Sequence, residues 1–140
     1  MEMSIPRTET QSAPVSNKKV WAGRILSGLV TAFLLFDAGI KFSTMPEVRD
    51  SFTSLGYSPA VAPTTGILML ACVVLYVIPR TSLLGAVVLT GYLGGAIATH
   101  VRVGNPLFSH VLFPVYVAAF IWGGLLLRDE RLRQLFPLRK

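Results

Sequence analysis

The chain has 140 residues, of which 52% are hydrophobic and 14% charged, and its mean hydropathy is +0.59. This composition excludes a soluble domain of this size and indicates one integral membrane domain. The net charge of +6 does not indicate a nucleic-acid binder, because the Lys and Arg residues lie in tails and short connections and form no stripe with exposed aromatic side chains.

The N-terminal residues 1–17 are rich in Ser, Thr, Pro and Glu and lack the apolar periodicity that a buried core needs. We therefore expect a disordered cytoplasmic tail, followed by a membrane domain over residues 18–140. The first apolar run begins near Val20 and is long enough to cross a bilayer, so it is not typical of a cleaved signal peptide.

Four apolar stretches approach the roughly 20 helical residues that cross about 30 Å of hydrocarbon. They are residues 20–42, 60–78, 83–101 and 111–127. The expected fold class is all-α, an integral membrane four-helix bundle with both termini in the cytoplasm. The sequence Pro79-Arg80-Thr81-Ser82 predicts a tight turn, and Gly104-Asn105-Pro106 predicts another that brings both ends of its loop to one membrane face.

The first connection is long enough for a short helix of its own. The sequence Thr44-Met45-Pro46-Glu47 is typical of a capping box, and Val48, Phe52 and Leu55 recur at helical spacing as one apolar stripe. Gly56 is a plausible helix stop. We expect an interfacial helix between the first and second spans.

The basic residues predict the orientation. With four crossings, one side of the membrane holds both tails and the second connection, with Arg7, Lys18, Lys19, Arg24, Arg80, Arg128, Arg131, Arg133, Arg139 and Lys140. The other side holds Lys41, Arg49 and Arg102. The positive-inside rule places the first group in the cytoplasm. The fourth helix is expected to continue through residues 128–136 as a basic anchor on the headgroups.

The third apolar stretch is rich in small residues that allow close helix contact. The candidate helix-packing residues are Gly85, Gly91, Gly94 and Gly95. Packing inside the bundle is the first interpretation and a homodimer face is the alternative.

Asp37 and Lys41 are the candidate functional residues among the ionisable side chains of the first apolar run, where a charge is costly. Their i, i+4 spacing with the acid first favours an ion pair on one helix face. The functional alternative is a polar cluster with His100, Arg102 and His110 at the same outer face, in which a histidine moves protons and a cation holds a carbonyl or anionic ligand. Axial haem ligation by two histidines and a zinc site with Asp37 or Glu47 are disfavoured alternatives, so no metal is predicted.

Tyr92 and Trp122 lie inside apolar runs beside glycines. Core packing is the first interpretation for both aromatic side chains. The alternative is that a planar hydrophobic ligand such as a quinone lies between them. Cys72 is the single cysteine, which excludes an intrachain disulfide or a thiolate metal cage.

The chain resembles the DoxX-like family of small bacterial membrane proteins over about residues 20–139. The resemblance rests chiefly on Leu84-Gly85-Ala86, Leu89-Thr90-Gly91-Tyr92-Leu93-Gly94-Gly95-Ala96, Ala98-Thr99-His100 and Arg102. Asp37, Lys41, Phe113-Pro114 and Trp122-Gly123-Gly124-Leu125 agree with it. It implies a four-helix membrane bundle and a distant link to quinone and thiol redox complexes, since the family name derives from a subunit of a thiosulfate:quinone oxidoreductase.

Three functions remain open at this point. The first is a non-catalytic subunit or scaffold of a membrane complex in the cell inner membrane. The second is a quinone-linked oxidoreductase component with the outer polar cluster as its site, and the third is a small-molecule or lipid transporter. The expected partners are the lipid bilayer, other membrane or redox subunits, and a second copy of the chain. No cofactor is identified by the sequence beyond the quinone alternative.

Overall fold

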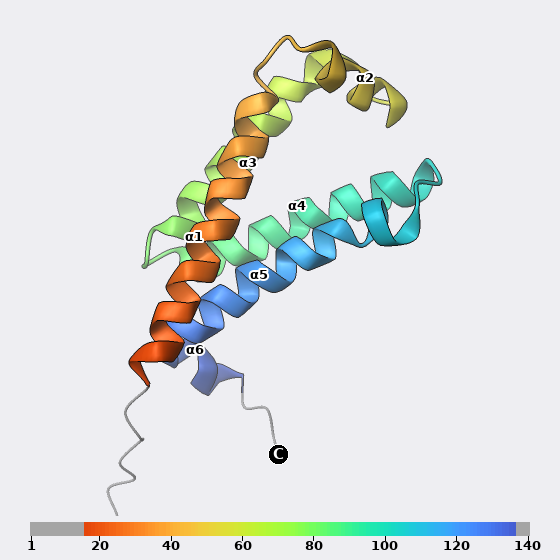
Figure 1. Cartoon of the computed structure of the whole chain (residues 1–140). Helices are drawn as coiled ribbons and strands as arrows, with labels where there is room; N and C mark the ends of the chain where they lie inside the picture. The colour runs from red at the N-terminus through yellow and green to blue at the C-terminus, as the bar shows by residue number, and fades with distance from the viewer. Residues whose placement is uncertain (1–15, 137–140) are drawn as a thin grey trace, which may run out of the picture.

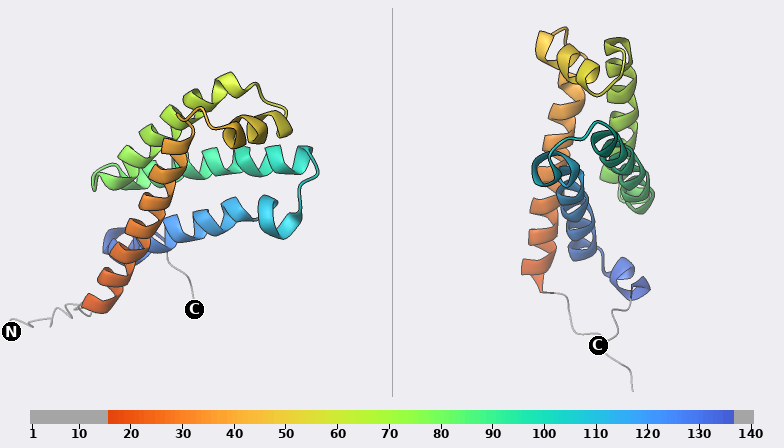
Figure 2. Two further views of the ribbon diagram at one scale, coloured as in Figure 1. Left: turned by 45° about the horizontal axis from the view of Figure 1, so that its top comes forward. Right: turned by 90° about the vertical axis from the view of Figure 1, so that its right-hand side faces the viewer.

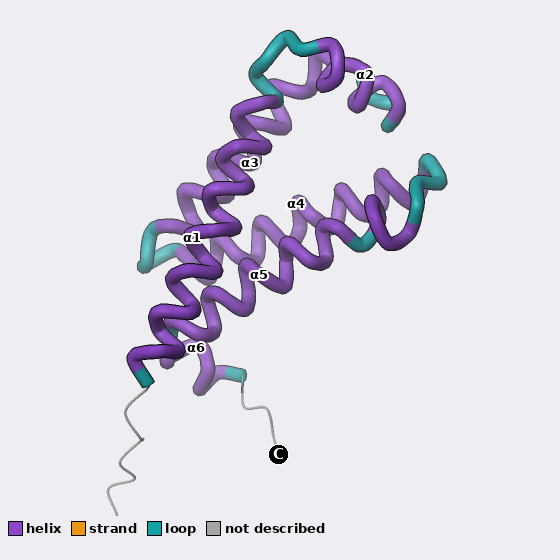
Figure 3. Tube along the Cα trace, viewed as in Figure 1, coloured by secondary structure: helices purple, strands orange, loops and turns teal. Residues whose placement is uncertain are grey.

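The computed structural model describes residues 16–136 and is helical throughout, with no strand in that range (Figures 1 and 3). Of the tail expected over residues 1–17, residues 1–15 lie outside the described residues, and Asn17 is already the first residue of α1. The helices are α1 (Asn17–Ile40), α2 (Pro46–Ser54), the 3-10 helix η1 (Pro59–Val61), α3 (Ala62–Val77), α4 (Ser82–Arg102), the π-helical turn η2 (Leu107–Val111), α5 (Phe113–Arg128) and α6 (Glu130–Leu135).

Four of the described segments are long and apolar enough to cross a membrane, which confirms the predicted all-α class with four membrane-length helices. They are Asn17–Ile40, Pro59–Val77, Ser82–Arg102 and Leu107–Arg128. The predicted spans agree with these bounds to within a few residues. The fourth span is longer than expected, because η2 adds a turn before α5 and brings this segment to 22 residues.

The four membrane-length helices form a splayed bundle. Each packs on two neighbours, α1 on α3 and α5, and α4 on the same two helices. In Figure 1, α1 with α3 and α4 with α5 form two arms that meet where α1 begins and diverge toward α2 and η2, and Figure 2 shows α2 and η2 on the side of the molecule away from the start of α1. We call the end at which the arms meet the closed end; it comprises the start of α1, the α3–α4 turn and the end of α5. We call the other end the open end; it comprises α2, the end of α4 and η2.

Glycines allow the helices to meet closely at the closed end. A Cβ added at Gly85 would lie 2.2 Å from the backbone nitrogen of Tyr76, and one at Gly23 would lie 2.7 Å from that of Arg128. At Gly124 the added atom would lie 2.9 Å from the Ser27 backbone nitrogen. Larger residues there would force the backbones apart, so these glycines set the helix spacing.

A buried hydrogen-bond network joins three helices next to these contacts. The hydroxyl of Tyr76 on α3 donates to the carbonyl of Ile121 on α5 at 2.9 Å and accepts from Ser27 Oγ on α1 at 3.1 Å. The guanidinium of Arg128 lies 5.0 Å from the centre of the Tyr76 ring. A buried hydroxyl without a hydrogen-bond partner is costly, so these two bonds stabilise the packed arrangement of the three helices.

The connection before α2 differs from the expected capping box. Met45 is the N-cap residue, and no side-chain cap bond forms at this end. Pro46 at the first helical position explains this, because its fixed φ favours helix initiation without such a bond. The predicted short helix and its stop are confirmed, since Gly56 has φ +81°. Gly104 likewise ends α4, with φ +73°.

The fourth helix does not continue through residues 128–136, which corrects the expected continuous basic anchor. Asp129 is extended, with φ −117° and ψ 106°, and its carboxylate accepts from the backbone N–H groups of Arg131 and Leu132. Asp129 is therefore the N-cap of a separate helix, α6. Leu132 of α6 is buried against the core.

Candidate functional site

A cavity of ≈ 690 Å³ lies between the arms of the bundle. We call it the open-end cavity. It is lined by Phe33, Leu34, Asp37, Ile40 and Lys41 of α1, by Val48, Ser51, Phe52, Leu55, Tyr57 and Val61 of the first connection, by Thr65, Leu68 and Met69 of α3, by Gly91, Tyr92, Leu93, Gly95, Ala96, Thr99 and His100 of α4, and by Phe113, Pro114 and Val117 of α5. Most of these side chains are apolar, which is the character expected of a pocket for a small organic molecule.

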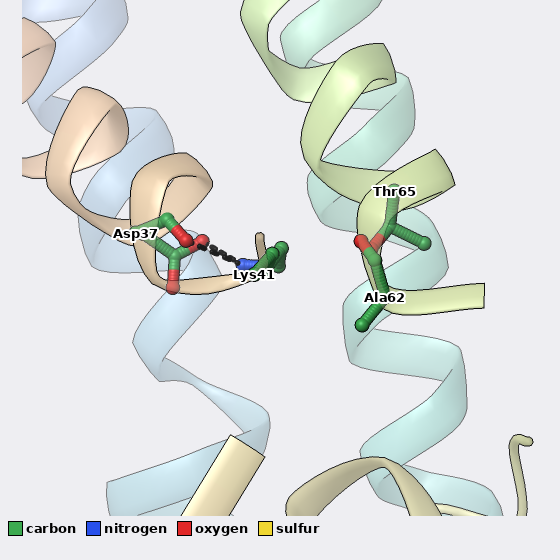
Figure 4. A network of polar contacts seen from close by, with 4 residues as sticks. All are labelled: Asp37, Lys41, Ala62 and Thr65. Carbon is green, nitrogen blue, oxygen red and sulfur yellow. Dashed lines mark hydrogen bonds and ion pairs between the residues drawn. The ribbon is translucent and has the colours of Figure 1, made fainter. Parts of the chain in front are cut away.

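Asp37 and Lys41 form an ion pair in this cavity. The Lys41 ammonium donates to Asp37 Oδ2, and it also donates to the Asp37 carbonyl at 3.3 Å. Figure 4 shows both side chains on α1 facing the turn of α3 that carries Ala62 and Thr65. The Lys41 side chain is 13% exposed and that of Asp37 is 31% exposed. The pair therefore places two opposite charges in a largely apolar wall.

His100 enters the cavity from the last turn of α4. Asn105, in the following loop, donates from Nδ2 to His100 Nδ1 at 2.7 Å. The proton of the neutral ring is then on Nε2, so that this nitrogen is the one left to a ligand. The ring of His110 lies edge-on at 5.7 Å from that of His100, but His110 belongs to η2 and does not line the cavity.

Other polar side chains also line the cavity, and a hydrogen bond between two of them joins two of its walls. Tyr92 of α4 is half-buried against the core. The Tyr57 hydroxyl lies 2.9 Å from Thr99 Oγ1, which joins the segment after α2 to α4. Thr65 Oγ1 donates to the carbonyl of Ala62 at 2.8 Å within α3. The polar groups of the cavity thus come from α1, α3 and α4 and from the connection between α1 and α3.

Arg102 and Trp122 also lie outside the cavity. Arg102 donates from Nη2 to the carbonyl of Leu55 at 2.6 Å, and its guanidinium lies 5.7 Å from the centre of the Tyr57 ring. Arg102 therefore ties the end of α2 to α4. Trp122 donates from Nε1 to Thr90 Oγ1 at 2.9 Å and so joins α5 to α4.

The four glycines of α4 divide into two groups. Gly85 lies in the tight contact with Tyr76 at the closed end. An added Cβ at Gly91, Gly94 or Gly95 would meet no heavy atom within 4 Å, so the expected packing of these three inside the bundle is corrected. Gly91 and Gly95 line the cavity, which their missing side chains enlarge.

The described residues 16–136 contain no group of three His, Cys, Asp or Glu side chains placed to hold a metal ion. The zinc alternative that combined both histidines with Asp37 or Glu47 therefore lacks its ligand geometry.

The model of the DoxX-like family matches residues 25–124. The chain belongs to the DoxX-like family. This match extends from α1 to Gly124 of α5 and includes all of the residues that line the open-end cavity of this DoxX-like chain. No curated protein and no solved structure matches the chain.

The sequence did not reveal that the apolar stripe of α2 contributes to the cavity wall. Val48, Phe52 and Leu55 were recognised as a stripe but were expected to face the membrane surface alone, whereas all three line the cavity. An amphipathic period shows that a face is buried without showing what buries it. Phe33 and Phe113, which pack edge-on with centroids 5.6 Å apart, gave no signal because aromatic residues are common in any membrane helix.

Proposed function

We propose that this protein is a non-catalytic membrane subunit that binds a neutral, lipid-soluble molecule with ring carbonyl groups, of the quinone class, in the open-end cavity. The observation that carries the proposal is the Asp37–Lys41 ion pair in the wall of a large apolar cavity. Apolar walls with a few convergent polar groups are the usual form of a small-molecule site.

The charge balance of the cavity favours a neutral ligand. Asp37 already compensates the charge of Lys41, and His100 is the other ionisable side chain at the polar end besides the tyrosines. An anionic headgroup would need a cation of its own, since an uncompensated charge in an apolar wall is costly. The Lys41 ammonium has three donor positions, so it can keep Asp37 and still donate to a carbonyl oxygen.

The second polar contact comes from the opposite helix. His100 Nε2 is the ring nitrogen left over by the bond from Asn105, and a neutral ring donates from it. A ligand with two carbonyl oxygens on one ring would use both Lys41 and His100, with the Tyr92 ring beside it. These groups bind and orient; a reaction of the ligand would draw its electrons from a partner subunit.

The proposal includes a location in the cell inner membrane. We infer that the closed end faces the cytoplasm, as the positive-inside rule predicts from Lys18, Lys19 and Arg80. The open-end cavity would then lie toward the outer face. Labelling single cysteines placed at residue 19 and residue 58 of a Cys72→Ala chain in intact cells with an impermeant maleimide tests this, and labelling at residue 19 would contradict it.

The binding proposal is tested by ligand-dependent thermal stabilisation of the purified protein, with 2,3-dimethoxy-5-methyl-1,4-benzoquinone as the probe. Lys41→Met should weaken binding about tenfold or more, since a hydrogen bond from a charged group contributes about 1.5–3 kcal/mol. Lys19→Met is the matched control, because Lys19 is exposed at the closed end, and it should bind as the unchanged protein does.

Equal binding by the Lys41→Met and Lys19→Met variants would contradict the proposal. No stabilisation of the unchanged protein at millimolar quinone, with only lipid copurifying in mild detergent, would favour the scaffold function. Substrate flux in liposomes would favour a transporter.

A further inference from the structure

A second, smaller hollow adjoins the open-end cavity on the lipid-facing side of the bundle. It has a volume of ≈ 240 Å³ and lies between α1 and α5. We call it the seam groove. Its walls are Leu29, Val30 and Phe33 on α1 and Phe113, Tyr116 and Phe120 on α5, together with Val117. None of these residues is charged, and the groove is open to the lipid because Leu29 and Phe120 are exposed.

The two hollows share part of their walls. Phe33, Phe113 and Val117 line both of them. The rings of Phe33 and Phe113 meet edge-on at this boundary, with centroids 5.6 Å apart. Both rings are partly exposed, 41% and 45%, and side chains of this kind change rotamer on a fast timescale. The boundary between the cavity and the groove is therefore formed in part by two side chains that can change conformation without a movement of the helices.

The groove runs in the direction that the tail of an amphiphile would take. Its α5 wall extends from Phe113 to Phe120, which at 1.5 Å per residue is about 10 Å toward the closed end. The polar groups lie at the opposite side, since Asp37 and Lys41 are one or two turns nearer the open end than Phe33. A ligand held by these groups would have its head toward the membrane surface and its chain toward the bilayer centre.

We infer that the seam groove binds the hydrocarbon chain of the ligand whose ring occupies the open-end cavity, so that the natural ligand is a long-chain, isoprenoid-type or alkyl quinone. This inference rests on the proposed function and adds the class of tail. A short polar molecule would leave the groove to membrane lipid. A long-chain ligand would gain affinity from each methylene group that packs more closely in the groove than it does outside the protein.

Two quinones with the same ring test the inference in the purified full-length protein. One is 2,3-dimethoxy-5-methyl-1,4-benzoquinone, and the other carries a decyl chain on that ring. Leu29→Trp places an indole in the groove at an exposed position. Leu35→Trp is the matched control, because Leu35 is an exposed leucine on the same helix that lines neither hollow.

The measured quantity is the ratio of the affinity for the decyl quinone to the affinity for the short-chain quinone. Partition of the decyl quinone into detergent changes this ratio equally in every variant, so it does not affect a comparison between variants. Leu29→Trp should lower the ratio at least fivefold and leave binding of the bare ring unchanged, while Leu35→Trp should change neither. A decyl quinone with a diazirine at the end of its chain should crosslink to peptides that contain residues 29–33 and 116–120.

The outcomes separate the two proposals. An unchanged ratio in Leu29→Trp, or crosslinks confined to other helices while the ring still depends on Lys41, would overturn the inference about the tail and leave the ring site standing. Failure of both quinones to bind the unchanged protein would overturn both.

Discussion

The two ends of the bundle use the same kinds of residue for opposite purposes. At the closed end, Gly23, Gly85 and Gly124 bring helices into backbone contact, and the Tyr76 hydroxyl is satisfied by two other helices. At the open end, Gly91 and Gly95 have no helix against them and line a cavity of ≈ 690 Å³. The closed end therefore holds the arms together, and the open end leaves room for a ligand.

This difference shows that a glycine in a membrane helix is informative only with its surroundings. Where a backbone lies opposite, its missing side chain permits contact; where nothing lies opposite, it leaves space. The following substitutions test whether the closed end stabilises the fold while the open end leaves room for the ligand.

The largest effect is expected from Gly85→Ala. The new Cβ would lie 2.2 Å from the Tyr76 backbone nitrogen, so α3 and α4 must separate. We expect a loss of about 3 kcal/mol or more, at the upper limit of overpacking effects. Gly94→Ala is the matched control in the same helix; with no heavy atom within 4 Å, it should be neutral or stabilise by up to about 1 kcal/mol. Unfolding in a denaturing detergent titration measures both, and equal losses would contradict the comparison.

A smaller effect is expected at the ion pair. Asp37→Asn leaves the Lys41 ammonium, which is 13% exposed, without its charged partner. We expect a loss of about 1–2 kcal/mol, below the range for a fully buried pair because Asp37 is partly exposed. Asp50→Asn on the exposed face of α2 is the control and should change stability little. In the double variant Asp37→Asn with Lys41→Met, part of the loss should be recovered, and additive losses would show that the pair is not coupled.

Tyr76→Phe tests the closed end with a similar or slightly smaller effect. The substitution removes the hydrogen bonds to Ser27 and Ile121 and keeps the ring. We expect a loss of about 1 kcal/mol, because polar contacts between membrane helices contribute modestly. Tyr116→Phe, on the exposed face of α5, is the control. Affinity for the short-chain quinone, which does not reach the seam groove lined by Tyr116, should stay unchanged in both variants. A weakened ring site in Tyr76→Phe would show that the two ends are not independent.

The smallest effect on stability is expected from Arg102→Met. Arg102 is exposed and joins α4 to the carbonyl of Leu55, so its loss should change global stability by no more than about 1 kcal/mol. Hydrogen exchange over residues 46–58 should nevertheless become faster, because the attachment of α2 at the open end is released. Arg49→Met on α2 itself is the control. Unchanged exchange in Arg102→Met would show that the apolar stripe and the Tyr57–Thr99 hydrogen bond hold α2 in place without Arg102.

Much of the fold followed from the sequence because the bilayer sets strict requirements. About 20 apolar residues per crossing, ended by Pro79 or Gly104, fixed the number and the bounds of the spans without any tertiary information. The i, i+4 spacing of Asp37 and Lys41 was sufficient to predict their ion pair, since both residues belong to one helix. The third-helix motif was sufficient for the DoxX-like family.

The site required the tertiary structure. Within the candidate cluster, Asp37, Lys41 and His100 share the open-end cavity, while Arg102 and His110 lie outside it. The sequence predicted that all five lie at one membrane face. Sequence patterns give the position of a residue along its helix and do not give the direction in which its side chain points. Which residues of one face point to one cavity depends on how each helix is rotated about its axis and how far the arms diverge. Those two quantities are decided by contacts between distant segments, above all the closed-end glycines, and no local pattern encodes them.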